Sequence, residues 1–188
     1  MPQNQADVEL QGASVFLDES RFAEVYESWK AAVGGVLRSD QHWALVGIKR
    51  RGAVIARRLW EAFRGDFPQL DYGEVDISLY RDDYHLQLSQ PRVLGTEIGF
   101  DVDSCRILLV DDVLYTGRTI RAALGLILDF GRPRRVLLAV LADRGHRELP
   151  IAADFVGVQV KTAAEDRVRV QLSELDGADR VLLARASS

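Results

Sequence analysis

Apolar and polar residues follow two patterns along this chain. Three runs, Trp43–Ile48, Arg106–Val110 and Val136–Leu141, are almost continuously apolar, which is typical of strands buried on both faces of a sheet. Weaker patterns predict four more strands, Glu74–Tyr80, Phe155–Val160, Val168–Leu172 and Val181–Leu183. The polar stretch Asp82–Ile98 contains proline and glycine and predicts a long loop or hairpin arm.

Between the strands, apolar residues recur every three or four positions and predict amphipathic helices. The first helix has Asp18 or Ser20 as its cap, and the third begins after Gly117 and ends at Gly131 and Pro133. The expected core faces of the three helices are Phe22, Val25, Tyr26, Trp29 and Val33; Ile55, Leu59, Ala62 and Phe63; and Ile120, Ala123, Leu124 and Ile127. Strands that alternate with helices predict an α/β fold, with a mostly parallel central sheet and helices on both faces.

Composition narrows the class of protein. The chain has 188 residues, of which 47% are hydrophobic and 28% charged, as in an ordinary globular protein of one domain. A formal net charge of -4 gives no global sign of a nucleic-acid-binding protein. The single cysteine, Cys105, excludes an internal disulfide and suits a reducing compartment. Because neither a membrane-spanning apolar stretch nor a signal peptide is visible, we expect a cytoplasmic protein without membrane contact.

The clearest candidate chemistry follows the strand that is predicted to end at Val110. Two acids, Asp111 and Asp112, precede a turn of small residues that opens a helix. Backbone N–H groups at such a helix start converge on an anion, Gly117 lets the backbone come close, and threonine hydroxyls add donors. The spacing matches neither a P-loop nor a dinucleotide fingerprint. The plainer reading is that the acids cap the helix, but one cap needs only one carboxylate. The pattern therefore favours a phosphate site.

These residues carry a resemblance to a known family. Two acids followed by Val, Thr-Gly and Thr match the signature of type I phosphoribosyltransferases, and Leu108–Thr119 is similar to the PyrR family of pyrimidine-operon regulators. Further matching segments are Leu45–Lys49, Arg51-Gly52, Asp76-Ile77, Leu79–Asp83, Gly131–Pro133 and Asp143–Ile151. The resemblance covers about Leu45 to Leu172. It implies one phosphoribosyltransferase domain over 1–188, with its core at about 17–172, a small hood formed by the N-terminal and C-terminal segments, and a flexible loop arm.

The resemblance also implies an activity and its residues. The reaction is uracil plus phosphoribosyl pyrophosphate (PRPP) giving UMP and pyrophosphate, with Mg²⁺ bound through the diphosphate and no protein cluster beyond Asp111 and Asp112. These two acids and Arg81 are the expected catalytic residues, and Arg81, Asp82 and Asp83 form the base of a lid. PRPP is expected to contact Lys49, Arg50, Arg51, Gly52, Val113, Leu114, Tyr115, Thr116, Gly117, Arg118 and Thr119. The base is expected to contact Arg144, Phe155 and Val156.

Several of these residues also have plainer readings. The segment from Lys49 could be a solvated basic turn, the segment from Arg81 a charged hairpin start, and Phe155 and Val156 core packing.

The resemblance implies a second function that this sequence supports less well. Members of the PyrR family are homodimers or larger oligomers that bind the leader mRNA of pyrimidine genes through a basic face, and UMP promotes binding. Where typical members have Thr-Arg-Ile-Ala-His-Glu, this chain has Glu27–Ala32, and Ala152 and Val158 stand at two further basic positions. Arg147 is retained, and Lys161 lies nearby. The alternative, a UMP-sensing RNA regulator with little catalytic role, therefore stays open but is less favoured than the enzyme.

Overall fold

The computed structural model describes residues 12–78 and 95–186 and is built on a six-stranded sheet. The strand order is β4-β3-β2-β5-β6-β7, and every neighbouring pair is parallel except β3 with β4. The strands are β2 (Trp43–Ile48), β3 (Asp71–Val75), β4 (Glu97–Ile98), β5 (Arg106–Leu114), β6 (Arg135–Asp143) and β7 (Phe155–Gln159), with a short 3-10 helix η1 (Val102–Ser104) before β5. The predicted mostly parallel sheet is confirmed.

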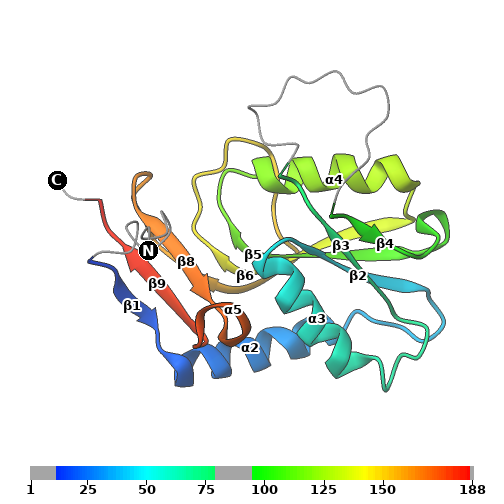
Figure 1. The fold of residues 1–188 in the computed structure, drawn as a ribbon, viewed down its shortest axis with the longest axis horizontal. Helices are drawn as coiled ribbons and strands as arrows, with labels where there is room; N and C mark the ends of the chain where they lie inside the picture. Colours follow the sequence, from blue (N-terminus) through cyan, green and yellow to red (C-terminus); the bar gives the residue numbers. More distant parts are fainter. Residues whose placement is uncertain (1–11, 79–94, 187–188) are drawn as a thin grey trace.

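Helices cover both faces of this sheet (Figure 1). Helices α2 (Glu19–Gly34) and α3 (Arg51–Phe63) lie on one face, and α4 (Arg118–Phe130) lies on the other. Alternate residues of each strand enter the two cores: along β5, Leu108 and Val110 join the first core, and Ile107 and Leu109 join the second. Asp18 caps α2 by accepting the Arg21 N–H at 2.9 Å.

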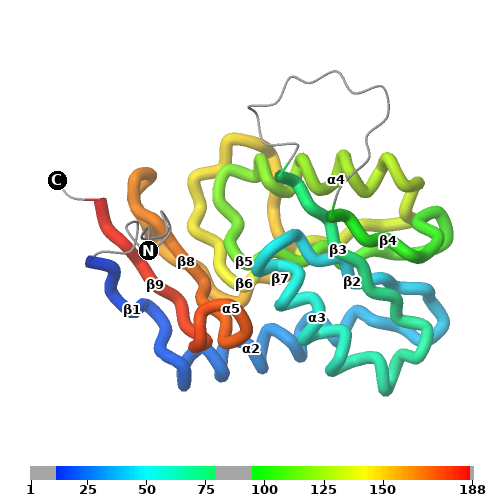
Figure 2. The backbone as a smooth tube through the Cα atoms, viewed as in Figure 1, coloured from blue at the N-terminus to red at the C-terminus, as the bar shows by residue number. Residues whose placement is uncertain are grey.

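A second sheet joins the two ends of the described chain and forms the predicted hood. Its order is β1-β9-β8, with all pairs antiparallel. The elements are β1 (Ser14–Leu17), β8 (Arg167–Gln171), α5 (Ser173–Asp176) and β9 (Arg180–Ala184). The tube in Figure 2 shows β8 beside the carboxyl ends of β5 and β6, so the hood overhangs the edge of the main sheet where a ligand is expected. Our sequence reading predicted neither β1 nor α5.

Two predicted strands have the wrong bounds: pairing explains the first, and a local turn explains the end of the second. Strand β5 continues to Leu114 instead of ending at Val110, because β6 is equally long and pairs with it as far as Asp143. The two acids therefore lie within the part of β5 that pairs with β6, not beyond its end. The strand predicted over Glu74–Tyr80 is instead Asp71–Val75. It ends there because the Asp76 carboxylate accepts the Ser78 N–H at 2.9 Å and turns the chain.

Helix faces agree with the sequence pattern apart from single positions. Ala62, expected in the core, is exposed. Four other expected core residues are only half-buried: Val25, Tyr26, Phe63 and Leu124. Helix α4 ends at Phe130, and Gly131 follows with a positive φ, as expected. Most of the predicted loop arm lies in 79–94, outside the described residues. Among the helices of 12–78 and 95–186, none has the length and apolarity needed to cross a membrane.

Candidate functional site

The two acids lie at the carboxyl end of the central strand. Asp111 is 6% exposed, and its Oδ1 accepts the Asp112 N–H at 3.0 Å. Burial raises the pKa of Asp111 well above its ordinary value, and the negative charge of Asp112 raises it further. Burial also raises the pKa of Asp112, although the positive charge of Arg51 offsets part of that effect. Two adjacent carboxylates held in this environment attract positive charge, which is what a sugar carbon losing its leaving group develops.

Directly after the acids, the chain forms a turn whose N–H groups are available to a ligand. Within the part of the chain that the structure describes, the backbone N–H groups of Thr116, Gly117 and Thr119 donate to no acceptor. The Thr116 carbonyl accepts the N–H groups of Glu148 and Leu149 at 3.0 and 3.1 Å, which fixes the turn. Gly117 has φ 91°, a conformation that only glycine adopts without strain. The start of α4 thus presents donors and the positive end of its dipole, as a phosphate requires.

The remaining predicted phosphate contacts lie around this turn. Val113 and Leu114 are the last residues of β5, and the side chain of Leu114 is buried in the core, so only its backbone can meet a ligand. Arg118 Nε donates to Glu148 Oε2 at 2.7 Å. Arg118 is therefore held at the rim by an acid and does not point freely at the turn.

The second predicted loop lies beside the first, because β2 and β5 are neighbours. The loop begins with a cis peptide bond between Lys49 and Arg50. A Cβ atom on Gly52 would lie 2.5 Å from the Val110 carbonyl oxygen and 3.1 Å from Asp111 Oδ1, so the glycine lets this loop pack directly on the acid pair. Arg50 is exposed at the loop's tip.

The lysine of this loop points away from the acids. Lys49 Nζ lies 3.3 Å from Glu74 Oε2 and 3.5 Å from Glu97 Oε1. Burial lowers the pKa of Lys49, but the hydrogen bonds and charges of Glu74 and Glu97 outweigh it and leave the pKa raised. In this arrangement Lys49 is charged and already neutralised, so the loop's cation nearest the acids is Arg51.

A residue that sequence reasoning missed holds this arginine. Arg51 Nη2 donates to Asp176 Oδ1 at 2.7 Å, and the Asp176 carboxylate, 8% exposed, also accepts from Arg169 at 3.3 Å and from the Leu172 N–H at 3.1 Å. Burial raises the pKa of Asp176, but these donors outweigh it and leave the pKa lowered. The signal was faint: α5 has four residues and ends at Gly177, whose positive φ marks a helix end.

The predicted base contact Arg144 lies at the same edge of the sheet but has partners of its own. Its guanidinium carbon lies 3.9 Å from the centre of the Tyr115 ring, and Nη2 donates to the carbonyls of Ala163 and Ala164 at 3.1 and 3.0 Å. The Tyr115 hydroxyl donates to the Ala164 carbonyl at 3.1 Å. Arg144 therefore stacks on the phosphate turn and joins it to the segment that follows β7. A direct contact to a base stays a prediction.

Phe155 and Val156 lie further from this edge than expected. They are the first residues of β7 and stand level with Val110 and Asp111, whereas the strand reaches the level of Leu114 only at Gln159. Both side chains pack against the cores, Phe155 on the α2 side and Val156 on the α4 side. The backbone of 160–164, which contacts Tyr115 and Arg144, lies at the edge instead. Arg81, the third predicted catalytic residue, lies outside the described residues, as do Asp82 and Asp83.

The donor set fits a magnesium ion held mainly by a ligand. Among the described residues no group of three or more His, Cys, Asp or Glu side chains is placed to hold a metal. Asp111 and Asp112 supply hard carboxylate oxygens, and a bound cation would offset the burial that raises both pKa values. A divalent ion carried in by a diphosphate would satisfy both.

A parallel sheet whose central strand ends in an acid pair and a phosphate-binding turn, with a cationic loop beside it, defines a phosphoribosyltransferase. The family model of the phosphoribosyl transferase domain matches residues 29–175. More narrowly, the chain belongs to the PyrR family. It is 52% identical over 146 residues to the bifunctional protein PyrR of Chloroflexus aurantiacus, and the aligned region covers 77% of this chain and 80% of that protein. The PyrR of Bacillus mycoides is 52% identical over 140 residues, or 73% of this chain and 78% of that one.

Solved structures agree on the fold. A hypoxanthine phosphoribosyltransferase from Staphylococcus aureus superposes with a TM-score of 0.67 at 19% identity and covers 98% of both chains. The corresponding enzyme of Trypanosoma cruzi gives a TM-score of 0.68 at 17% identity and covers 93% of this chain and 95% of that one. Because these identities are low, the structures show the type I phosphoribosyltransferase fold and do not indicate which base this chain uses.

Proposed function

We propose that this protein is a uracil phosphoribosyltransferase that converts uracil and PRPP to UMP and pyrophosphate. The observation that carries the proposal is that three parts of the site meet at one edge of the sheet. These are the acid pair with its buried Asp111, the turn of free N–H groups after it, and the arginine loop packed on it through Gly52. Each part suits one portion of PRPP: the ribose, the 5-phosphate and the diphosphate. Membership of the PyrR family supports uracil as the base.

The proposed reaction breaks the bond between ribose C1 and the diphosphate and forms a bond from C1 to the uracil nitrogen, which loses its proton. Asp111 and Asp112 hold the ribose hydroxyls and stabilise the positive charge on the ring as the leaving group departs. The turn at Thr116–Thr119 anchors the 5-phosphate, so the sugar is fixed between two points. Arg51 faces the diphosphate. When bound, Mg²⁺ neutralises the leaving group, with Asp111 and Asp112 as the side chains that would hold it.

We place the base beside the segment 160–164 in preference to Phe155 and Val156. This segment contacts Tyr115 of the phosphate turn, so a base attached to the anchored sugar falls within its reach. Backbone carbonyl and N–H groups there could read the edge of a pyrimidine ring. Arg144, stacked on Tyr115, positions both the segment and the turn.

The decisive experiment is a product assay. The purified protein is incubated with PRPP, Mg²⁺ and uracil, hypoxanthine, guanine or orotate, and nucleotide formation is measured by chromatography. We expect UMP as the main product and no turnover with excess EDTA. Nucleotide formation from a purine or orotate in preference to uracil would refute the base assignment, and full activity in EDTA would refute the magnesium requirement.

A UMP-sensing regulator of leader RNA remains the second candidate, supported by the PyrR family and opposed by local chemistry. On α2, Lys30 Nζ lies 2.6 Å from Glu27, which neutralises it. The partly exposed side chain of the retained Arg147 donates to Asp143 Oδ2 at 2.5 Å and to the Tyr115 carbonyl at 2.7 Å. Neither cation is free to face RNA phosphates. We therefore expect catalysis with weak RNA binding.

A further inference from the structure

Two adjacent cavities, which share three lining residues, lie at the edge of the main sheet opposite the acid pair. One has a volume of about 140 Å³ and is lined mainly by apolar side chains, among them Leu37, Trp43, Phe67 and Leu70. The other has a volume of about 460 Å³, and Arg38, Gln41 and Trp43 line both. The first residues of β2, β5 and β6, which are Trp43, Arg106 and Arg135, stand side by side there. Arg106 is about 17 Å along β5 from Asp111, so these cavities are separate from the site described above.

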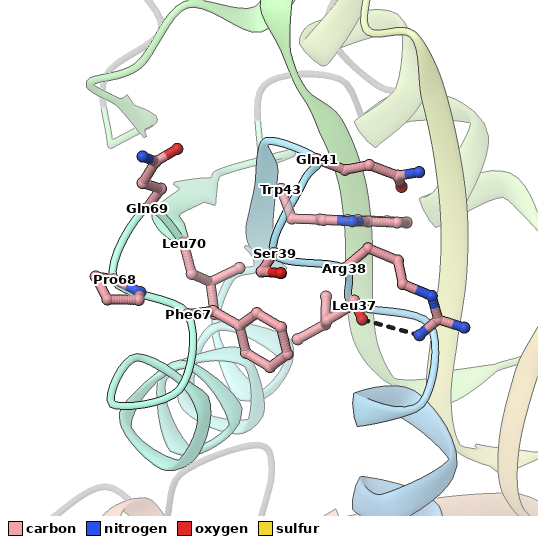
Figure 3. Close-up of a pocket in the computed structure, with 9 residues that line it drawn as sticks. All are labelled: Leu37, Arg38, Ser39, Gln41, Trp43, Phe67, Pro68, Gln69 and Leu70. Carbon is pink, nitrogen blue, oxygen red and sulfur yellow. Dashed lines mark hydrogen bonds between the residues drawn. The ribbon is translucent and has the colours of Figure 1, made fainter.

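Trp43, whose indole lines both cavities, has an unsatisfied donor. Trp43 is 5% exposed, and its Nε1–H is buried with no acceptor in the part of the chain that the structure describes. Figure 3 shows the indole lying between the side chains of Gln41 and Arg38. A buried N–H without a partner costs free energy, and a ligand acceptor at this position would recover it.

The larger cavity is positively charged. Arg38, Arg106 and Arg135 line it, together with Asp154. The guanidinium groups of Arg106 and Arg135 make no hydrogen bond or ion pair with any described residue, whereas Asp154 Oδ2 is occupied by the Leu138 N–H at 2.8 Å. Arg38 is held in place because its Nη1 donates to the carbonyls of Gly35 and Leu37 at 2.8 and 3.0 Å.

We propose that the two cavities form a second binding site, for an aromatic organic phosphate of nucleotide size. The ring enters the apolar cavity with an acceptor near Trp43 Nε1, and the phosphate lies among the three arginines. A guanidinium group can bind two phosphate oxygens at once through two parallel N–H bonds. Sites for small ligands typically combine an aromatic wall with a few convergent polar or charged groups. The apolar cavity alone is too small for a nucleotide. The arginine cavity alone would bind a phosphate group without recognising an aromatic ring. Together they fit a ligand that carries both parts.

The test is calorimetric titration of the full-length protein with UMP and with AMP, with uridine and inorganic phosphate as partial ligands. We expect a second, weaker binding event for at least one nucleotide. Replacing Arg106→Gln and Arg135→Gln together should weaken that event at least about a hundredfold, because each arginine supplies a charge-assisted hydrogen bond to phosphate that is worth about tenfold in affinity. Phosphoribosyl transfer and the first binding event should be unchanged. The matched control is Arg132→Gln with Arg134→Gln, two exposed arginines outside both cavities, which should leave the second event intact.

The Trp43→Phe variant distinguishes the contribution of the aromatic ring from that of the N–H donor. Phenylalanine keeps an aromatic wall and removes the N–H, so the second event should weaken by about threefold to tenfold while thermal unfolding stays close to wild type. A single binding event for both nucleotides, the same in wild type and in the Arg106/Arg135 variant, would overturn the proposal. So would phosphate binding as tightly as a nucleotide, which indicates a nonspecific anion site. Loss of oligoribonucleotide binding in that variant, with no second nucleotide-binding event in wild type, would also overturn it in favour of an RNA surface.

Discussion

Gly52→Ala is the smallest change that should disable the site, because one added carbon meets the backbone under the acid pair. The Cβ atom would lie 2.5 Å from the Val110 carbonyl oxygen and 3.0 Å from Asp111 Cα, and Cβ contacts under 3.0 Å are essentially never seen. The nearest obstacle is backbone in the middle of a parallel sheet, which cannot rotate away as a side chain would. The loop at Lys49–Gly52 and β5 must therefore separate by at least about half an ångström.

The size of the effect follows from two opposing contributions. Overpacking a close contact costs about 1–3 kcal/mol, and replacing a helical glycine by alanine returns about 0.5–1 kcal/mol. We expect Gly52→Ala to lower the free energy of unfolding by about 1–2 kcal/mol. Catalysis should suffer more than stability, because moving reacting groups by 1 Å costs about a hundredfold in rate. A shift of half that size predicts a loss of about tenfold or more in kcat/KM.

Gly125→Ala is the matched control, since it is the same substitution in helix α4. A Cβ atom at Gly125 meets nothing within 4 Å, so only the helix preference remains and the free energy of unfolding should rise by about 0.5–1 kcal/mol. Urea denaturation followed by circular dichroism measures stability, and initial rates of UMP formation measure kcat/KM. If Gly52→Ala keeps wild-type stability and rate, or if Gly125→Ala loses as much as Gly52→Ala, the close-packing argument is wrong.

Three further results are expected. Asp111→Asn combined with Asp112→Asn should reduce UMP formation by far more than tenfold, yet raise stability at neutral pH. The pKa of Asp111 is raised in the fold, so its ionisation costs stability at neutral pH, and the variant's advantage should vanish as the pH falls and the wild-type acid becomes protonated; equal stability in urea at pH 7 would contradict this. Asp176→Asn should raise the KM for PRPP and lower stability, with the stability difference shrinking as acid protonates the wild-type carboxylate, whose pKa is lowered; an unchanged KM would show that the ion pair does not position the loop. Binding to pyrimidine leader RNA, measured by gel shift with and without UMP at two salt concentrations, should be weak, and Arg147→Gln should hardly change it; sub-micromolar, UMP-enhanced and salt-sensitive binding would show a basic face that we did not identify.

The sequence was most informative where one local rule decides the structure. The continuously apolar run Trp43–Ile48 is a strand with those bounds, and Gly117 and Gly131 bracket helix α4 as predicted. These positions depend on burial and on the conformations that glycine permits, both of which are visible in a single stretch of residues. The acid pair was found for the same reason, since it stands directly before its turn.

Properties that depend on distant partners were not predictable in this way. The end of β5 is set by the length of β6, and the end of β3 by an aspartate that turns the chain. Asp176 was missed because its role depends on the hood folding back over the loop at Lys49–Gly52. Asp176 lies 125 residues from Arg51 in the sequence. Phe155 was expected near the base from the resemblance to phosphoribosyltransferases, and its contact with a base stays a prediction. Its level in the sheet, beside Ala139, depends on how β7 pairs with β6, which one stretch of residues does not reveal.

The hood does more than cover the site, because the acid pair depends on charge that the hood holds in place. An ionised Asp111 in a buried position is unfavourable, and Arg51 is the nearby cation that offsets the burial of its neighbour Asp112. Arg51 in turn is fixed by Asp176, whose carboxylate is bonded through Arg169 to the second sheet. In the proposed function the diphosphate binds an Arg51 that Asp176 already holds in position, so this ion pair links the PRPP site to the hood. Substrate binding and hood position should therefore be coupled through one arginine.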